Sequence, residues 1–408
     1  MLFLYICLTL SCLALLVAGI VEQRRHDACL HSIPHRVLVN GIRGKSSITR
    51  LIAGALRGGD VRAVAKTTGT AARFIRPSGA EQPVYRKFDV PNVAEQIAVV
   101  RKAARHKPET LVVECMAIDP RLQEISQTKM IQSTIGVICN VREDHLEEMG
   151  PTLDDVARSL ARSMPVGGIC VTAERERLPI LDEEARKRGC LLLSASPHAV
   201  TDEEMSRFPY VAFKENVSIA LTVAGLLGVP RDKALDGMWK AAPDPGVLRV
   251  AECAPFGRRL RFANVMAAND PESTLMNIKQ LLQQGAVTRP LYLVVNCRAD
   301  RMERNAQMGA LTADIAPERV ILIGESTRTA RVAVPGRWQD LVVDLGGRRA
   351  PQDLLADVIA EIPHHASLVA VGNIHGQGEA LAQQLSHHPA TQPFTSALPL
   401  AAVRGEAR

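Results

Sequence analysis

The sequence is poor in aromatic residues and has only a small excess of basic ones. Aromatic side chains make up 3% of the 408 residues, and 49 Lys and Arg against 43 Asp and Glu leave a net charge of +6. Proteins that bind single-stranded nucleic acid combine basic grooves with aromatic side chains on which bases stack. Because no basic run here is interleaved with aromatics, nucleic acid is not an expected partner.

Cysteine motifs and internal repeats are also missing. The nine cysteines are scattered, odd in number and never spaced as C-x-x-C, a pattern that argues against a zinc site or a disulfide framework. Several lie in apolar, strand-like runs, so we expect reduced, buried thiols, as in a cytosolic compartment. With 47% hydrophobic residues, the chain is long enough for two or three domains with cores of their own.

The first 21 residues, MLFLYICLTLSCLALLVAGIV, carry no charge. A helix needs about 20 apolar residues to cross a bilayer. No basic residue precedes this run, as one would in a secretory signal, whereas Arg24 and Arg25 follow it, and such a flank stays on the cytoplasmic side. We expect residues 1–22 to form a single-pass anchor in the cell membrane, with the catalytic body in the cytoplasm. A cleaved signal peptide or a buried helix is the alternative.

The stretch 35–50, HRVLVNGIRGKSSITR, predicts a strand, a glycine turn and a helix. In such an arrangement backbone N–H groups approach phosphate oxygens, and the helix N-terminus favours negative charge. Lys45 would supply a point charge to the distal phosphates, and the hydroxyl of Ser46 can ligate magnesium. The spacing G-x-x-G-K-S is shorter than that of the strict P-loop. An ordinary glycine turn followed by an exposed lysine is therefore the alternative.

Polar side chains stand at the ends of two further apolar runs. The run 110–115, TLVVEC, brings Glu114 to a strand end, and the run 135–140, IGVICN, leads into V-R-E-D-H and His145. Ligands of parallel sheets bind beyond the carboxyl ends of the strands. Glu114 is a candidate magnesium ligand or orienting base. His145 is either a metal ligand or phosphate-polarising group, or an ordinary histidine. The loop Thr-Thr-Gly-Thr at 67–70 either offers donors to an anionic substrate or is a plain turn.

The rest of the chain has an α/β pattern in two parts. Helices are expected at 92–105, 152–162 and 174–188, the last a charged and solvated one, and strands at 168–172, 190–194, 210–213, 291–296, 320–324, 341–344 and 368–372. Asn216 opens another apolar helix, either as its N-cap or as a contact for an adenine edge. The segment PDPGVLR, 243–249, is a plausible boundary between the parts, and the chain beyond His387 is expected to be loose.

Eight motifs occur in order: NGIRGKSSITR, KTTGTAAR, VVECMA, NVREDHLEEMGPTLDDVA, AAPDPG, AANDPEST, NCRADR and VGNIHG. Together they resemble the ATP-dependent ligase subunit of poly-γ-glutamate synthase, a membrane-anchored family of capsule-polymer enzymes, over nearly the whole chain. That family is similar to the Mur ligases and to folylpolyglutamate synthase. The resemblance implies a Mur ligase-like P-loop domain with a parallel sheet at 33–250, a smaller Rossmann-like α/β domain at 270–388 and a flexible tail at 389–408.

The resemblance also implies an activity. Glutamate would be added to the γ-carboxyl group of a growing poly-γ-glutamate chain through an acyl phosphate, with ATP and Mg²⁺ as cofactors and ADP and phosphate as products. The implied partners are integral-membrane subunits of the synthase, and a homo-oligomer is left open. Two alternatives remain: another Mur-like amino-acid ligase, and a non-catalytic nucleotide-binding scaffold of a membrane export complex.

Site residues follow by matching the family's motifs to this chain. The implied catalytic residues are Lys45, Glu114, His145 and Arg249, the last a phosphate contact. The implied nucleotide contacts are Asn40, Gly41, Arg43, Gly44, Lys45, Ser46, Ser47, Asn216 on the adenine side and Asp270 at the ribose. The implied metal ligands are Ser46, Glu114 and His145.

Two features depart from the Mur ligases. Arg43 stands where many Mur ligases have asparagine, a feature that poly-γ-glutamate enzymes share. Mur ligases also hold a second metal with a carbamylated lysine after the histidine, whereas this chain has no lysine between Lys129 and Lys187.

Overall fold

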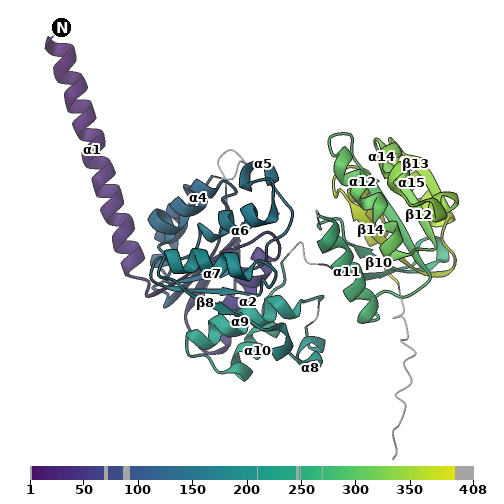
Figure 1. Ribbon diagram of the computed structural model, residues 1–408, viewed down its shortest axis with the longest axis horizontal. Helices are drawn as coiled ribbons and strands as arrows, with labels where there is room; N and C mark the ends of the chain where they lie inside the picture. Colours follow the sequence, from purple (N-terminus) through teal and green to yellow (C-terminus); the bar gives the residue numbers. More distant parts are fainter. Residues whose placement is uncertain are drawn as a thin grey trace, which may run out of the picture. The chain divides into compact units, whose positions relative to one another are not determined.

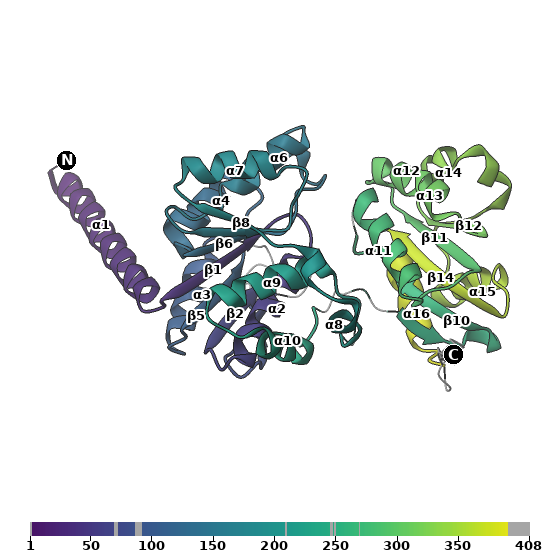
Figure 2. The ribbon, with the colours of Figure 1, turned by 60° about the horizontal axis from the view of Figure 1, so that its bottom comes forward.

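The structure is a computed structural model and describes residues 2–68, 72–85, 92–208, 210–244, 248, 250–268 and 270–390. The chain divides into two compact units, Met1–Val247 and Leu248–Arg408 (Figure 1). Each unit is built on its own sheet, with helices on both faces (Figure 2).

Helix α1 (Leu2–His31) opens the first unit and is, by length and composition, a candidate membrane span. Its final turns contact the folded body. Arg101 donates a hydrogen bond to Glu22 at 2.8 Å, and the ring of buried His26 lies 2.8 Å from the carbonyl oxygen of Met130. The apolar part of α1 is exposed, as a membrane span would be in the absence of lipid.

The first sheet has eight strands in the order β4-β3-β2-β5-β1-β6-β7-β8. The strands are β1 (His35–Asn40), β2 (Ala63–Thr67), β3 (Arg73–Ile75), β4 (Glu81–Pro83), β5 (Thr110–Glu114), β6 (Ile135–Ile138), β7 (Ile169–Thr172) and β8 (Leu191–Ser194). All neighbours are parallel except at the β2-β3-β4 edge, which is antiparallel. Since β1 lies between β5 and β6, the strand order reverses beside it, and the loops after these three strands meet at one edge.

Helices cover both faces of this sheet. They are α2 (Lys45–Gly58), α3 (Glu95–Ala104), α4 (Pro120–Ile125), the π-helix η1 (Ser126–Ile131), α5 (Leu146–Met149), α6 (Leu153–Ala161), α7 (Leu178–Lys187), the 3₁₀ helix η2 (Pro197–Ala199), α8 (Asp202–Ser206), α9 (Lys214–Leu226) and α10 (Arg231–Lys240). Side chains alternate along β1, so that Val37 and Val39 pack with α2, α9 and α10, whereas Leu38 packs with α3 and the end of α1.

Glycines set the distance between α2 and α10. A Cβ atom on Gly237 would lie 2.1 Å from the carbonyl oxygen of Gly54 and 2.8 Å from the Cα atom of Gly58. The two helices therefore touch backbone to backbone, which only glycine permits. This contact fixes α2, the helix that begins at Lys45.

The second unit has a six-stranded sheet in the order β13-β12-β11-β14-β10-β9, in which only the β9-β10 pair is antiparallel. Its elements are β9 (Val250–Cys253), η3 (Pro255–Gly257), β10 (Arg259–Asn264), α11 (Pro271–Gln283), β11 (Leu291–Cys297), α12 (Met302–Ala310), α13 (Thr312–Ile315), β12 (Arg319–Gly324), α14 (Thr327–Ala333), η4 (Gly336–Leu341), β13 (Val342–Gly346), α15 (Pro351–Ala360), β14 (His365–Gly372) and α16 (Gln377–Ser386). The alternation of strands and helices expected from sequence is confirmed.

Some expectations differ from the structure. The run 210–213 is not a strand: Tyr210 and Ala212 pack in the core with side chains of α9. The second sheet includes β9 and β10, which precede the expected domain start at residue 270. The chain directly after His387 is ordered rather than loose, because Pro389 forms an antiparallel β-bridge with Cys253. Residues 391–408 lie outside the described residues.

Candidate active site

The turn between β1 and α2 is shaped by two glycines in the left-handed half of conformational space. Gly41 has φ 133°, and a Cβ atom there would lie 2.8 Å from the Cβ atom of Cys139. Gly44 has φ 82° and is the N-cap of α2, so no side chain caps this helix. The N–H groups of its first turn, which includes half-buried Ser47, therefore remain available to an anion.

Lys45 folds back over this turn. Its Nζ atom donates hydrogen bonds to the carbonyl oxygens of Gly41, at 2.6 Å, and of Ile42, at 3.1 Å. The ammonium group is thereby held beside the glycine turn, and its side chain is only half-buried. A positive charge at this position is suited to neutralising a phosphate at the helix N-terminus.

Ser46 and Glu114 meet at the adjoining strand end. The Ser46 hydroxyl donates to Glu114 Oε2 at 2.7 Å, and the backbone N–H of Thr68 donates to the same oxygen at 2.6 Å. Glu114 is only 3% exposed and ends β5 next to β1. The polar loop at 67–70 thus contributes a backbone donor to Glu114, while Gly69 and Thr70 lie outside the described residues.

Two buried thiols line the same region. Burial raises the pKa of Cys139 to about 12, against the opposing effect of the Lys45 ammonium, and the Glu114 carboxylate raises it further. Burial likewise raises the pKa of Cys115 to about 11. Both thiols are therefore neutral and form an apolar wall beside the charged groups. All nine cysteines are free, as expected, and six are buried.

His145 is joined to the glycine turn through its neighbour Asp144. The Arg43 guanidinium lies 3.1 Å from Asp144 Oδ2, and the imidazole Nε2 atom of His145 lies 3.7 Å from the same oxygen. His145 has φ 51° and precedes α5. Its side chain is 44% exposed, so it is accessible to a ligand.

Asn216, in helix α9, also lies close to the glycine turn. It is the third residue of α9, whose N-cap is Phe213, so the interpretation of Asn216 as an N-cap is wrong. Its amide group lies beside Gly44: a Cβ atom on that glycine would be 3.2 Å from Asn216 Oδ1. The Asn216 side chain therefore lies beside the residue that precedes the first turn of α2.

Two of the expected contacts have side-chain partners of their own, and a third is not among the described residues. The buried side chain of Asn40 donates to Gln123 at 2.8 Å and Ser163 at 3.0 Å, which makes it part of a core polar cluster. Asp270 is the buried N-cap of α11 in the second unit, and its Oδ1 atom accepts from Ser273 at 2.7 Å. Arg249 lies outside the described residues.

The donors at Ser46 and Glu114 suit a magnesium ion. Mg²⁺ prefers oxygen ligands and commonly takes only one or two from the protein, with phosphates and waters completing its coordination. Among the described residues no group of three His, Cys, Asp or Glu side chains is arranged to hold a metal. The assignment of His145 as a third ligand therefore stays a prediction.

Two polar residues of this region were not singled out from sequence. Lys66 on β2 is fully buried and pairs with Glu95, and Asn140 holds the backbone of Arg43 with both ends of its amide. Lys66 stands in a buried strand, and Asn140 lies two residues beyond the end of β6. A polar residue in or just after a buried strand indicates a buried polar contact, but the sequence does not show which residue it contacts.

Comparison with known families gives two matches along the chain. Residues 39–224 match the Mur ligase middle domain, and residues 250–388 match the Poly-gamma-glutamate synthase CapB C-terminal domain. The chain is 36% identical to PGA synthase CapB of Bacillus subtilis over 395 residues, which cover 94% of this chain and 98% of that protein. It is 43% identical to the capsule biosynthesis protein CapB of Bacillus anthracis over 318 residues, covering 77% and 68%.

Solved structures share the fold at low sequence identity. FolC of E. coli in complex with ADP matches with a TM-score of 0.65 and 14% identity, covering 90% of this chain and 92% of that one. MurF of Acinetobacter baumannii matches with a TM-score of 0.64 and 14% identity, covering 90% and 79%. The expected Mur ligase-like α/β fold is thus confirmed. The chain belongs to the family of poly-γ-glutamate synthase CapB proteins, ATP-dependent ligases with a Mur ligase middle domain.

Proposed function

We propose that this protein polymerises glutamate through γ-amide bonds and activates the carboxylate as an acyl phosphate. The observation that carries the proposal is the meeting of Lys45, Ser46 and Glu114 at the edge where β1 and β5 end. The names of its CapB relatives, and a folylpolyglutamate synthase of the same fold solved with Mn, AMPPNP and L-glutamate bound, support glutamate and ATP as substrates.

The chemistry explains why these groups are needed. A carboxylate is a poor acyl donor, so a γ-carboxylate oxygen first attacks the γ-phosphorus of ATP, the bond to the bridging oxygen breaks, and ADP leaves. The amine of the incoming glutamate then attacks the acyl carbon, the carbon–oxygen bond to phosphate breaks, and the nitrogen loses a proton. Because the reactants are anionic, catalysis rests mainly on positioning and charge neutralisation.

Each residue has a role in this scheme. Lys45 and the first turn of α2 would bind the β- and γ-phosphates. Ser46 and Glu114 would hold Mg²⁺, which neutralises the charge that develops on the phosphates. We assign His145 to the metal or the transferred phosphate, Arg249 to the phosphates, Asn216 to the adenine side and Asp270 to the ribose.

The apolar helix α1 suits a single span with the catalytic body in the cytoplasm, where ATP is available. One helix forms no path for a polymer across a bilayer. Integral-membrane subunits are therefore the proposed partners.

Polymer synthesis by isolated membranes tests the proposal. Membranes containing the protein and its partner subunits should form polymer from ATP and glutamate, and Lys45→Ala should abolish synthesis while the protein stays in the membrane. Lys187→Ala, which changes an exposed lysine of α7, is the matched control. Normal polymer output from Lys45→Ala would refute the mechanism.

Two further assays separate the alternatives. If single amino acids are offered with ATP, glutamate should stimulate ADP release most, whereas another preferred amino acid would indicate a different Mur-like ligase. Hydroxylamine should trap the activated carboxylate as a hydroxamate. A protein that binds ATP but yields no hydroxamate from any carboxylate would be a scaffold.

A further inference from the structure

Three loops of the first unit follow neighbouring strands and are tied together by side chains. They follow β1, β6 and β7, which lie side by side in the sheet. The first loop is the glycine turn, the second carries Asp144 and His145, and the third carries Glu174 and leads to α7. Sequence patterns had placed Glu174 in a solvated, charged helix, but it precedes α7 and is half-buried.

Asn140 connects the second loop to the first. Its Oδ1 atom accepts a hydrogen bond from the N–H of Arg43 at 3.0 Å, and its Nδ2 atom donates to the carbonyl of Arg43 at 3.1 Å. One planar amide thus holds both backbone polar groups of the residue before Gly44. The ion pair between Arg43 and Asp144 adds a second connection between the same loops.

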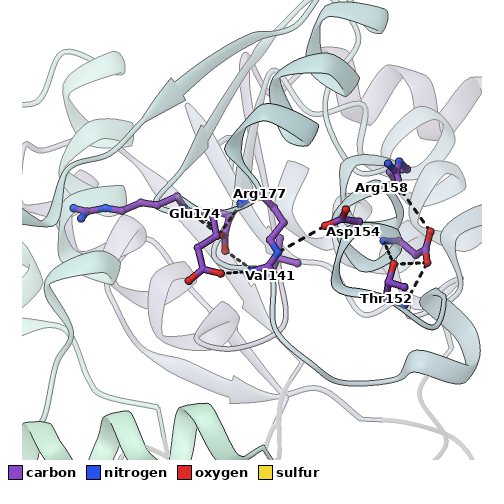
Figure 3. Close-up of polar contacts among 9 residues, drawn as sticks. Val141, Thr152, Asp154, Arg158, Glu174 and Arg177 are labelled. Atoms are coloured by element: carbon purple, nitrogen blue, oxygen red, sulfur yellow. Dashed lines mark hydrogen bonds and ion pairs between the residues drawn. The ribbon is translucent and has the colours of Figure 1, made fainter.

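Glu174 connects the third loop to the second. Its Oε2 atom accepts from the N–H of Val141 at 2.8 Å, next to Asn140 (Figure 3). Its Oε1 atom accepts from the N–H groups of Arg175 at 3.0 Å, Glu176 at 2.9 Å and Arg177 at 3.3 Å. The carboxylate therefore does two separate things with its two oxygens: one stabilises its own turn, and the other holds the loop after β6.

We infer that Glu174 and Asn140 are positioning residues that fix the shape of the glycine turn, with Val141 as the link between them. The turn must present its N–H groups in one arrangement before an anion arrives, because ordering it on binding would cost affinity. Neither side chain needs to touch the ligand for this. The inference rests on the proposed function only for the identity of that ligand, ATP.

The role of Glu174 Oε2, which contacts Val141, can be tested separately from the role of Oε1, which caps the turn of Glu174 itself. Glu174→Asp keeps the charge and the capping of Arg175–Arg177, since aspartate caps such turns well, but is one methylene too short to reach Val141. Asn140→Ala removes the contacts to Arg43. Glu176→Gln is the matched control, because it removes a carboxylate two residues away that is 78% exposed.

The experiment uses the full-length protein in lipid nanodiscs with a fluorescent ATP analogue. Glu174→Asp and Asn140→Ala should each raise the dissociation constant of the analogue about tenfold. The dissociation constant of the double variant should be close to that of Asn140→Ala alone, since both substitutions break the same connection between the loops. At saturating ATP the kcat should stay close to wild type. A merely structural role would instead lower the unfolding midpoint and the active fraction, with an unchanged KM for ATP.

Hydrogen exchange of the nucleotide-free protein gives a readout that does not depend on ATP. Amides of residues 41–47 should exchange faster in Glu174→Asp and in Asn140→Ala, and at the wild-type rate in Glu176→Gln. Unchanged exchange in Glu174→Asp, or nucleotide affinities whose losses simply add in the double variant, would overturn the inference. Failure of the wild-type protein to bind the analogue would refute the proposed function, whereas the exchange rates would still decide the role of Glu174 and Asn140.

Discussion

The hydroxyl of Ser46 lies 2.7 Å from the carboxylate of Glu114, although 68 positions of sequence separate them. Ser46 is in the first turn of α2, and Glu114 is the last residue of β5. The pair exists because β1 and β5 are adjacent and parallel, with Val39 opposite Glu114 in the register. It gives the glycine turn an oxygen donor set of the kind that Mg²⁺ prefers.

We predict that Glu114→Gln lowers ADP release about 100-fold, because the substitution keeps the shape of the side chain and removes the charge that would hold the metal. Titration of Mg²⁺ at fixed ATP checks this, and the requirement should shift to higher concentration. Glu109→Gln, on the exposed residue that precedes β5, should behave like wild type. An unaltered Mg²⁺ dependence in Glu114→Gln would remove Glu114 from the metal site.

Arg50 should contribute strongly to the stability of the first unit. Its side chain is 3% exposed, forms a double hydrogen bond with Glu81 and lies 3.5 Å from Asp244. Arg50→Ala removes a buried cation from beside two carboxylates and should cost about 3 kcal/mol of unfolding free energy. Denaturant unfolding of the full-length protein measures it, with Arg186→Ala as the control. Arg186 is 78% exposed in its pair with Asp182, and its loss should leave the midpoint unchanged. Equal effects of the two variants would contradict the prediction.

Two glycines in helices should respond to alanine with opposite signs. Gly237→Ala would push a Cβ atom to 2.1 Å from the carbonyl of Gly54 and should cost about 2 kcal/mol, since α2 and α10 must separate. Gly225 in α9 has no atom within 4 Å of such a Cβ, so Gly225→Ala should stabilise by about 0.5 kcal/mol through helix propensity. Thermal unfolding of both variants checks the signs. Stabilisation by Gly237→Ala would show that the helices are not held by this contact.

The buried thiols predict a loss of stability at alkaline pH. Burial raises the pKa of Cys115 from 9.0 to about 11 and that of Cys139 from 9.0 to about 12. Below pH 9 these thiols are neutral in both states. Between pH 9 and the folded-state values only the unfolded thiols ionise, so each should lower the unfolding free energy by about 1.4 kcal/mol per pH unit.

Unfolding of the reduced protein between pH 8 and 11 measures this effect. Cys139→Ala should show a shallower slope than wild type, although its stability at pH 8 is lower because of the cavity it creates. Iodoacetamide at pH 9 should modify Cys139 slowly in the folded protein and quickly after unfolding. Rapid modification in the folded state would mean that the thiol is not buried as described.

Sequence patterns predicted the long elements better than the short ones. The strands β1, β5, β6, β11, β12 and β14 contain buried apolar runs with glycine or polar residues at their ends, which are strong local signals. The three-residue strands β3 and β4 are too short to show alternation; β3 pairs with the edge of β2, and β4 pairs in turn with β3. The apolar run 210–213 was predicted as a strand, because a short segment buried against a helix has the same apolar composition as a segment buried in a sheet.

The amino-acid sequence by itself determined the glycine turn with its lysine and serine, the apolar helix that precedes it, and the α/β alternation of both units. These depend on neighbours within a few residues, where conformational preference and hydrophobic periodicity act directly. Tertiary structure alone decided that Ser46 meets Glu114, that Asn40 turns into the core and that Asn140 and Glu174 hold the loops beside the turn. Those contacts depend on strand order and register, which are set by the packing of the whole sheet and leave no local trace along the chain.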